Sequence, residues 1–107
     1  MVQNVLFVCS QNWHRSKTAE TLFSNNMQFN VKSAGTNSYA ETPLTEEILQ
    51  WADIVLVMES HHKKNILTKF SDSIAEDNII VLDIPDRYRY MDPELITNIK
   101  TKTKHIL

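Results

Sequence analysis

The chain has 107 residues, 42% of them hydrophobic and 22% charged, with a formal net charge of −2 at pH 7, which predicts one ordinary globular domain spanning residues 1–107. The small negative charge gives no electrostatic reason to expect a nucleic acid or a membrane as partner, and no apolar run is long enough to cross a bilayer. The single cysteine cannot form an internal disulfide, which excludes a secreted disulfide scaffold and favours a cytoplasmic protein.

Four short runs rich in Val, Ile and Leu predict strands that are buried on both faces, as in a parallel sheet covered by helices. In chain order these runs are residues 5–8, 31–33, 54–58 and 79–82.

Segments with helical spacing of apolar residues, or with a helix start signal, follow each run. In chain order the signals are the stripe Ala19, Leu22, Phe23 and Met27; the start Thr42-Pro43; the cap Ser60; and the start Asp92-Pro93-Glu94. The alternation of strands and helices predicts an α/β fold, a doubly wound four-stranded parallel sheet with helices on both faces.

Two polar stretches leave the carboxyl ends of predicted strands, where sheets of this kind bind their ligands. One is "CSQNWHRS" after the first strand, and the other is "DIPDRYRYMD" after the fourth. Because the connections are short, we expect both stretches to face one shallow cleft.

The first of these stretches contains Cys9, the only cysteine, and Arg15, one of three arginines. A turn from a strand into a helix can point its N–H groups inward and bind an anion, and the start of the helix adds its positive dipole end. Arg15 would hold two phosphate oxygens, and the same positive surroundings would keep Cys9 as a thiolate able to attack phosphorus. Ser16 would donate to that thiolate, and Asn12 tolerates a left-handed backbone.

The alternative for Cys9 is an inert core residue, the usual role of a lone cysteine that closes a strand. The strand–loop–helix setting favours the catalytic interpretation. Glu59, His61 and His62 suggest a metal site at first sight. Adjacent histidines on a helix point in different directions, so we expect no metal there.

The stretch "VLFVCSQNWHRSKTAETLF" resembles the opening of the low-molecular-weight protein tyrosine phosphatase family, whose signature is Cys-x5-Arg-Ser between the first strand and the first helix. The likeness continues through "VKSAGT", "ADIVLVMESHHKKNI" and "IPDRYRY", and it is greatest with a compact branch of short predicted tyrosine phosphatases. The resemblance implies a phosphomonoester hydrolase that acts through a phosphocysteine and uses no cofactor. The expected substrate is a phosphotyrosine-containing protein or a small aryl phosphate.

By this resemblance Cys9 would be the nucleophile, Arg15 the phosphate clamp and Asp86 the general acid. Asp83, at a strand end, and Asp92, a helix-cap position, remain rivals for the acid. The residues expected to bind the substrate or support its loop are Ser10, Gln11, Asn12, Trp13, His14, Ser16 and Tyr88.

Several positions depart from the family pattern. Gln11 replaces a glycine of the loop, His14 replaces a second cysteine, and Arg87 replaces the proline after the acid. The chain is also shorter around residues 37–45, where relatives build a wall of the pocket. Gln11 and Arg87 leave one alternative open, a non-catalytic phosphate-ester or phosphotyrosine-binding module. The resemblance leaves a second, an arsenate reductase, which with a single cysteine would need an external thiol.

Overall fold

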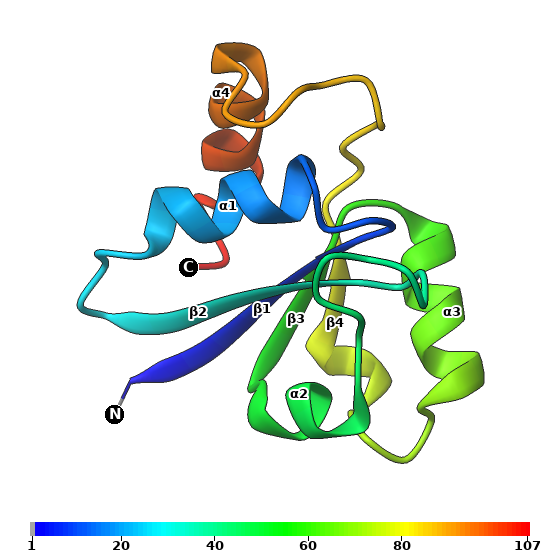
Figure 1. Ribbon diagram of the computed structural model, residues 1–107. Helices are drawn as coiled ribbons and strands as arrows, with labels where there is room; N and C mark the ends of the chain where they lie inside the picture. Colours follow the sequence, from blue (N-terminus) through cyan, green and yellow to red (C-terminus); the bar gives the residue numbers. More distant parts are fainter. Residues whose placement is uncertain (1) are drawn as a thin grey trace.

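The computed structural model describes residues 2–107 as a sheet of four strands covered by helices (Figure 1). The elements in chain order are β1 (Gln3–Cys9), α1 (Arg15–Phe23), β2 (Phe29–Gly35), α2 (Glu46–Trp51), β3 (Ile54–Val57), α3 (Ser60–Lys69), the 3₁₀ turn η1 (Glu76–Asn78), β4 (Ile79–Val81) and α4 (Pro93–Thr103).

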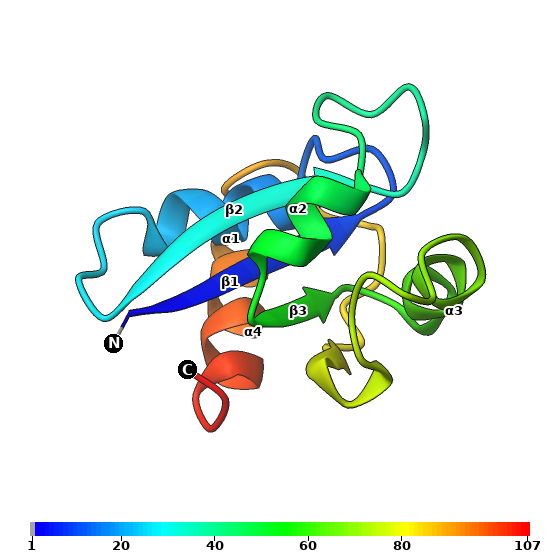
Figure 2. The ribbon, with the colours of Figure 1, turned by 90° about the horizontal axis from the view of Figure 1, so that it is seen from below.

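The sheet has the strand order β2-β1-β3-β4, and every neighbouring pair is parallel. Helices α1 and α4 cover one face, whereas α2 and α3 lie on the other (Figures 1 and 2). The predicted doubly wound α/β fold is thus confirmed. The carboxyl ends of β1, β3 and β4 meet at one edge of the sheet, which brings the segments that follow them together.

The core consists of two apolar layers, one on each face of the sheet. On the central strand β1, Phe7 and Cys9 face α1 and α4, while Leu6 and Val8 face α2 and α3. Phe7 also stacks on Phe23 with ring centroids 5.8 Å apart. Each large side chain buried in this way contributes roughly 1.5–3 kcal/mol. Burial on both faces explains why the strand appears in the sequence as a continuous apolar run.

Three of the predicted helix signals need correction. Helix α1 ends at Phe23, so Met27 lies beyond it and is 92% exposed. Helix α2 does not start at Thr42-Pro43, because Pro43 pairs with Gly35 in an extended bridge and extends the edge of the sheet. Ser60 is the first residue of α3, and Glu59 caps that helix instead.

The start of α4 is confirmed. The Asp92 side chain caps this helix by accepting a hydrogen bond from the Glu94 N–H at 2.9 Å, and Pro93 occupies its first turn. The strands differ from the prediction only at their ends, since β1 and β2 are longer than expected and β3 and β4 each end one residue earlier.

No helix in the part of the chain from residue 2 to residue 107 is both long and apolar enough to span a membrane.

Gly35, the only glycine, lies where the end of β2 meets the loop after β1. A Cβ atom at this position would be 2.5 Å from both the Ser10 carbonyl oxygen and the Ala40 Cβ. We expect Gly35→Ala to lower the free energy of unfolding by about 1–3 kcal/mol, because backbone on one side must shift. Thermal unfolding measures this change. An unchanged melting temperature would show that the backbone around Gly35 can shift without cost and would contradict the prediction.

Candidate active site

The loop between β1 and α1 turns its carbonyl groups away from the site. The Ser10 and Gln11 carbonyl oxygens accept N–H groups from the segment 37–41 at 3.0 and 3.1 Å. A trans peptide points its N–H opposite to its C=O, so the amides that follow these carbonyls face inward. The Asn12 N–H indeed donates to the Cys9 Sγ at 3.2 Å. The segment 37–41 therefore holds the loop with amide groups turned toward the site.

Asn12 gives the loop its tight turn. Its φ is 60°, in the left-handed region that its short polar side chain tolerates. Within residues 2–107 the non-glycine residues with positive φ are Asn12, Asp83 and Met91. Gln11 lies outside this group, so a side chain at the usual glycine position causes no left-handed strain.

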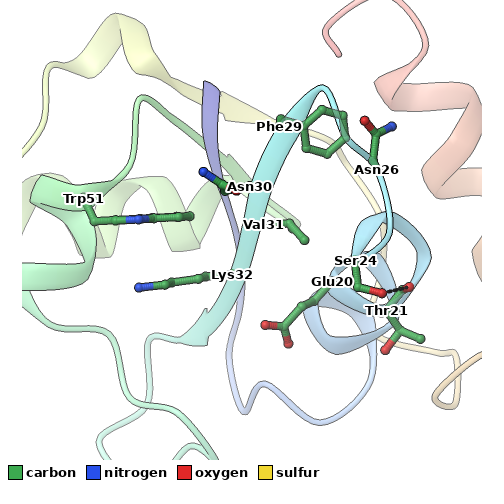
Figure 3. Close-up of a pocket in the computed structure, with 9 residues that line it drawn as sticks. All are labelled: Glu20, Thr21, Ser24, Asn26, Phe29, Asn30, Val31, Lys32 and Trp51. Atoms are coloured by element: carbon green, nitrogen blue, oxygen red, sulfur yellow. Dashed lines mark hydrogen bonds between the residues drawn. The ribbon is translucent and has the colours of Figure 1, made fainter. Parts of the chain in front are cut away.

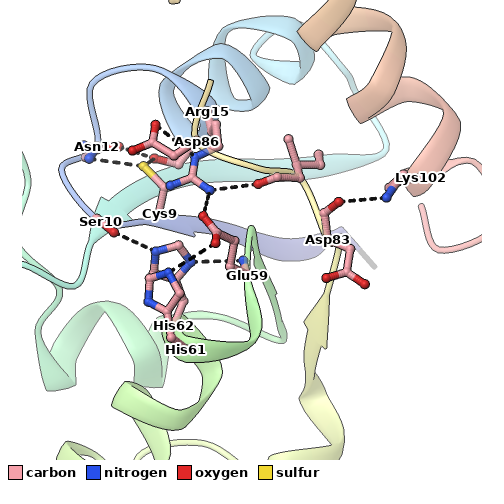
Figure 4. A network of polar contacts seen from close by, with 12 residues as sticks. Cys9, Ser10, Asn12, Arg15, Glu59, His61, His62, Asp83, Asp86 and Lys102 are labelled. Atoms are coloured by element: carbon pink, nitrogen blue, oxygen red, sulfur yellow. Dashed lines mark hydrogen bonds and ion pairs between the residues drawn. The ribbon is translucent and has the colours of Figure 1, made fainter. Parts of the chain in front are cut away.

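Cys9, drawn with its polar neighbours in Figure 4, lines a pocket of about 300 Å³. The residue is 3% exposed, and its Sγ lies 3.0 Å from the Ser16 Oγ. The Ser16 hydroxyl in turn donates to the Asn12 Oδ1 at 2.7 Å. The pocket is lined by Cys9, Ser10, Gln11, Trp13, His14, Arg15 and Asp86.

Arg15 is buried and held inside the site from two sides (Figure 4). Its Nη1 donates to the carboxylate of Glu59, at the start of α3, and to the Ile84 carbonyl oxygen at 2.8 Å. Its Nε lies 3.8 Å from the Asp86 Oδ1. These partners fix the plane of the guanidinium, whose directed N–H groups suit a phosphate.

Glu59 is the charged partner of this arginine. Partial burial acts to raise the pKa of Glu59, but the hydrogen bond and charge of Arg15, with smaller contributions from His61 and His62, hold the pKa below its usual value. Glu59 is therefore a carboxylate at neutral pH. The Glu59 carboxylate is thus the counterion of the buried Arg15 guanidinium.

His62, fully buried on the first turn of α3, uses both ring nitrogens. Its Nδ1 accepts the Glu59 N–H at 3.0 Å, and its Nε2 lies 2.8 Å from the Ser10 Oγ. Burial lowers the pKa of His62 to about 4, aided by the charges of His61 and Arg15 and opposed by Glu59. The imidazole is therefore neutral at physiological pH.

This neutral histidine predicts a pH dependence of stability. Between pH 4 and pH 6.5 the unfolded chain binds a proton at His62 that the folded chain does not bind, so stability rises with pH across this window and falls as the pH drops. The contribution amounts to roughly 3 kcal/mol. Urea unfolding at several pH values measures it, with His62→Asn as the comparison. Equal pH slopes in the two proteins would contradict the assignment.

Of the three candidate acids, only Asp86 lines the pocket. Its side chain is 68% exposed, and Figure 4 shows it beside Arg15. Asp92 is engaged as the cap of α4. The side chain of Asp83 lies away from Cys9 in Figure 4, and its carbonyl oxygen accepts from the Lys102 Nζ at 2.8 Å.

The structure brings most of the predicted residues together and places one elsewhere. Tyr88 is 5% exposed and packs in the core against α4, so its ring does not line the pocket as we expected. Asn12 and Ser16 are buried behind the thiol, and Trp13 is 57% exposed at the rim.

Glu59 and His62 were not predicted as site residues. Their signal was topological: β3 pairs directly with β1 in a doubly wound sheet, so the residues after β3 must lie next to the Cys9 loop.

Three hydrogen bonds hold the segment that follows Asp86, two of them from α1 and one from His14 just before this helix. The Tyr90 N–H donates to the His14 Nδ1 at 3.2 Å, and the Met91 N–H donates to the Thr18 Oγ1 at 2.9 Å. The Tyr90 hydroxyl lies 2.8 Å from the Thr21 Oγ1. His14 therefore links the thiol loop to the segment of the candidate acid.

A larger hollow, of about 570 Å³, lies beside the edge strand β2 (Figure 3). It contains none of the residues around the thiol, and the Lys32 Nζ covers the Trp51 ring at 4.5 Å from its centroid. The chemistry-bearing groups gather in the smaller pocket, which we take as the candidate active site.

The fold is that of the low-molecular-weight protein tyrosine phosphatases, which confirms the resemblance predicted from the sequence. No protein-family model matches the chain.

Among solved structures, the tyrosine phosphatase Wzb from Escherichia coli K30, in complex with phosphate, is similar with a TM-score of 0.78 and 21% identity, covering 98% of this chain and 96% of that one. SP-PTP, a low-molecular-weight protein tyrosine phosphatase from Streptococcus pyogenes, has a TM-score of 0.79 and 16% identity, covering 99% and 94%. A protein-arginine phosphatase of Bacillus subtilis (strain 168) is 31% identical over 94 residues, and the match covers 63% of this chain and 63% of that protein.

Proposed function

We propose that this protein is a Cys-dependent phosphomonoester hydrolase that acts in the cytoplasm on phosphotyrosine in proteins and on small aryl phosphates. The observation that carries the proposal is the meeting of the Cys9 thiol, the Arg15 guanidinium and the Asp86 carboxylate in one pocket. A tyrosine phosphatase with the same fold forms a complex with phosphate, which supports a phosphate group as the ligand.

The loop supplies what a phosphate dianion needs. Inward-facing amides and the start of α1 provide donors on one side. The Arg15 guanidinium provides charge and direction on the other. Since Glu59 and the Ile84 carbonyl already orient the guanidinium, little reorganisation is needed when the substrate arrives.

The first chemical step forms a bond between the Cys9 sulfur and phosphorus and breaks the bond from phosphorus to the leaving oxygen. Asp86 gives that oxygen a proton, which makes a neutral phenol the leaving group. In the second step the Asp86 carboxylate takes a proton from water while the water oxygen attacks phosphorus. Phosphate leaves, and the thiolate is restored.

Ser16 and Asn12 can serve both charge states of the sulfur. When the Ser16 hydroxyl donates to the Asn12 Oδ1, the short contact between sulfur and Ser16 requires the thiol to donate. The Asn12 Nδ2 is buried and has no hydrogen-bond partner among residues 2–107. If the Asn12 side-chain amide rotates by 180°, this Nδ2 would donate to the Ser16 Oγ. The hydroxyl proton would then be free for the thiolate.

Trp13 supports an aromatic substrate. Its ring is 57% exposed at the rim of the same pocket that Cys9 and Asp86 line. A phenyl ring attached to a phosphate over Cys9 would emerge beside this indole, where stacking stabilises it.

The proposal is tested by rapid mixing with p-nitrophenyl phosphate. We expect a burst of nitrophenol equal to the enzyme concentration and an acid-quenched adduct of one phosphate on Cys9. Phosphate binding without a burst would support the binding module instead. Thiol oxidation that depends on arsenate and on an added small thiol would support the reductase.

Asp86→Asn should lower kcat/KM for phenyl phosphate by about 10²-fold, because kcat/KM reports the step in which the poor leaving group needs a proton. The loss should be smaller for p-nitrophenyl phosphate, whose leaving group is already a stable anion. Asp83→Asn is the matched control and should leave both rates unchanged. Equal losses for the two substrates would remove Asp86 from the role of general acid.

Phosphoarginine is a second candidate substrate. It is favoured by the protein-arginine phosphatase that matches part of the chain and by the exposed carboxylate of Asp86, which can pair with a guanidinium at the pocket mouth. Comparing kcat/KM for a phosphotyrosine peptide and a phosphoarginine peptide of the same sequence decides between them. Trp13→Thr should reduce turnover of the phosphotyrosine peptide selectively if stacking contributes.

A further inference from the structure

We propose that His62 is a positioning residue of the phosphate site, which acts by fixing the Ser10 hydroxyl as a donor that points into the pocket. The inference rests on the proposed function, and it assigns a role to a residue that touches neither the thiol nor Asp86. Its basis is the pair of contacts that the buried ring makes with Ser10 and with the Glu59 backbone (Figure 4).

The tautomer of His62 follows from its partners. A backbone N–H can only donate, so the Nδ1 that receives the Glu59 N–H at 3.0 Å carries no proton. A neutral imidazole then has its proton on Nε2, the atom 2.8 Å from the Ser10 Oγ. His62 is therefore the donor in this contact, and Ser10 is the acceptor.

The direction of this hydrogen bond matters because a hydroxyl has one proton. Since the Ser10 Oγ accepts from His62, its own proton is not used there and can donate elsewhere. Ser10 is half-buried and lines the pocket, so the free donor faces the space that a phosphate oxygen would occupy. The opposite tautomer would draw the Ser10 proton toward the ring and present a lone pair to the anion.

The surroundings favour the neutral His62 ring with its proton on Nε2. The ring is 0% exposed and lies 4.0 Å, centroid to centroid, from the exposed ring of His61. The charged groups nearby are Arg15 and Glu59, which neutralise one another as a pair. Protonation of Nδ1 would point a second donor at the Glu59 N–H, so the contact itself opposes a charged ring.

Two amide variants of His62 separate the contact with the Glu59 N–H from the contact with the Ser10 Oγ. In His62→Asn the amide oxygen can replace Nδ1 and keep the bond to the Glu59 N–H, but the donor to Ser10 is lost. In His62→Gln the amide nitrogen can reach Ser10, while the cap is lost. His61→Asn, on the neighbouring exposed ring, is the matched control.

The first readout is the dissociation constant of inorganic phosphate, which needs no turnover. We expect His62→Asn to weaken phosphate binding about tenfold, with a rise of KM for p-nitrophenyl phosphate larger than the loss of kcat. His62→Gln should restore most of the affinity, although it unfolds more easily. Ser10→Ala should weaken binding as much as His62→Asn does, and the double variant should be no worse than either one.

Additive effects of Ser10→Ala and His62→Asn, or wild-type phosphate affinity in folded His62→Asn, would overturn the inference. The ¹⁵N chemical shifts of His62 in the wild-type protein test the tautomer directly, without any substitution. We expect the Nε2–H tautomer from pH 5 to pH 8, and an Nδ1–H tautomer or a charged ring would overturn the inference.

The two proposals fail separately. A wild-type protein that binds phosphate but hydrolyses no phosphate ester contradicts the proposed function, and the phosphate affinities of the variants still test the role of His62. Active wild-type enzyme with an additive double variant contradicts the role of His62 alone. Wild-type protein that does not bind phosphate overturns both.

Discussion

Replacement of Cys9 by serine should lower kcat for p-nitrophenyl phosphate by about 10⁴-fold or more, the scale of loss seen when a covalent nucleophile is removed. In the proposed mechanism a thiolate attacks phosphorus, whereas a serine hydroxyl in its place would stay protonated because no general base contacts it. The Asn12 N–H at 3.2 Å, and the Ser16 hydroxyl once the Asn12 amide has rotated, would stabilise a sulfur anion, but neither group removes a proton from an alcohol.

The same variant should still bind inorganic phosphate with an affinity within about threefold of the wild type, because the amides and Arg15 are untouched and serine is smaller than cysteine. Phosphate titration measures this, and circular dichroism confirms the fold. Turnover by Cys9→Ser at the wild-type rate would remove the phosphocysteine route. Loss of both binding and fold would instead point to a packing role for the buried thiol.

The fold was predictable because each buried strand carries its own signal. The run of β1 is apolar on both faces, and its Leu6 and Phe7 indeed face opposite layers of the core. Helix starts were less predictable, because a proline after a threonine fits a helix or an extended segment equally well. Pro43 extends the sheet edge beside Gly35, and only the tertiary pairing decides this.

The site was predictable where its residues are contiguous. The loop from Cys9 to Ser16 is one strand–turn–helix unit, and local chemistry determines most of its shape. Glu59 and His62 follow another strand, β3, and the sequence suggested for them only a metal site, which we did not expect. For Tyr88 the sequence suggested a site role that the structure does not give it. An aromatic residue suits a pocket wall, but the path of the chain after β4 turns the Tyr88 ring into the core.

Arg15→Lys should lower kcat/KM for p-nitrophenyl phosphate by about 10³-fold, although the charge is conserved. The guanidinium donates to Glu59 and to the Ile84 carbonyl oxygen and still presents directed N–H groups to a phosphate. One ammonium group cannot serve these partners and two phosphate oxygens together. Because the pairing is needed most as charge builds up on the transferring phosphoryl group, kcat should fall more than KM rises.

Arg87→Lys provides the matched control for this prediction. Arg87 is an exposed arginine in the segment that follows Asp86, and its guanidinium contacts the Tyr88 hydroxyl at 3.2 Å rather than the pocket. The contact with the phenol raises the pKa of Arg87, so this guanidinium keeps its charge. If only charge near the loop mattered, both lysine variants would stay active. A selective loss in Arg15→Lys shows that the site requires the forked geometry, and equal activity of the two variants would contradict the clamp.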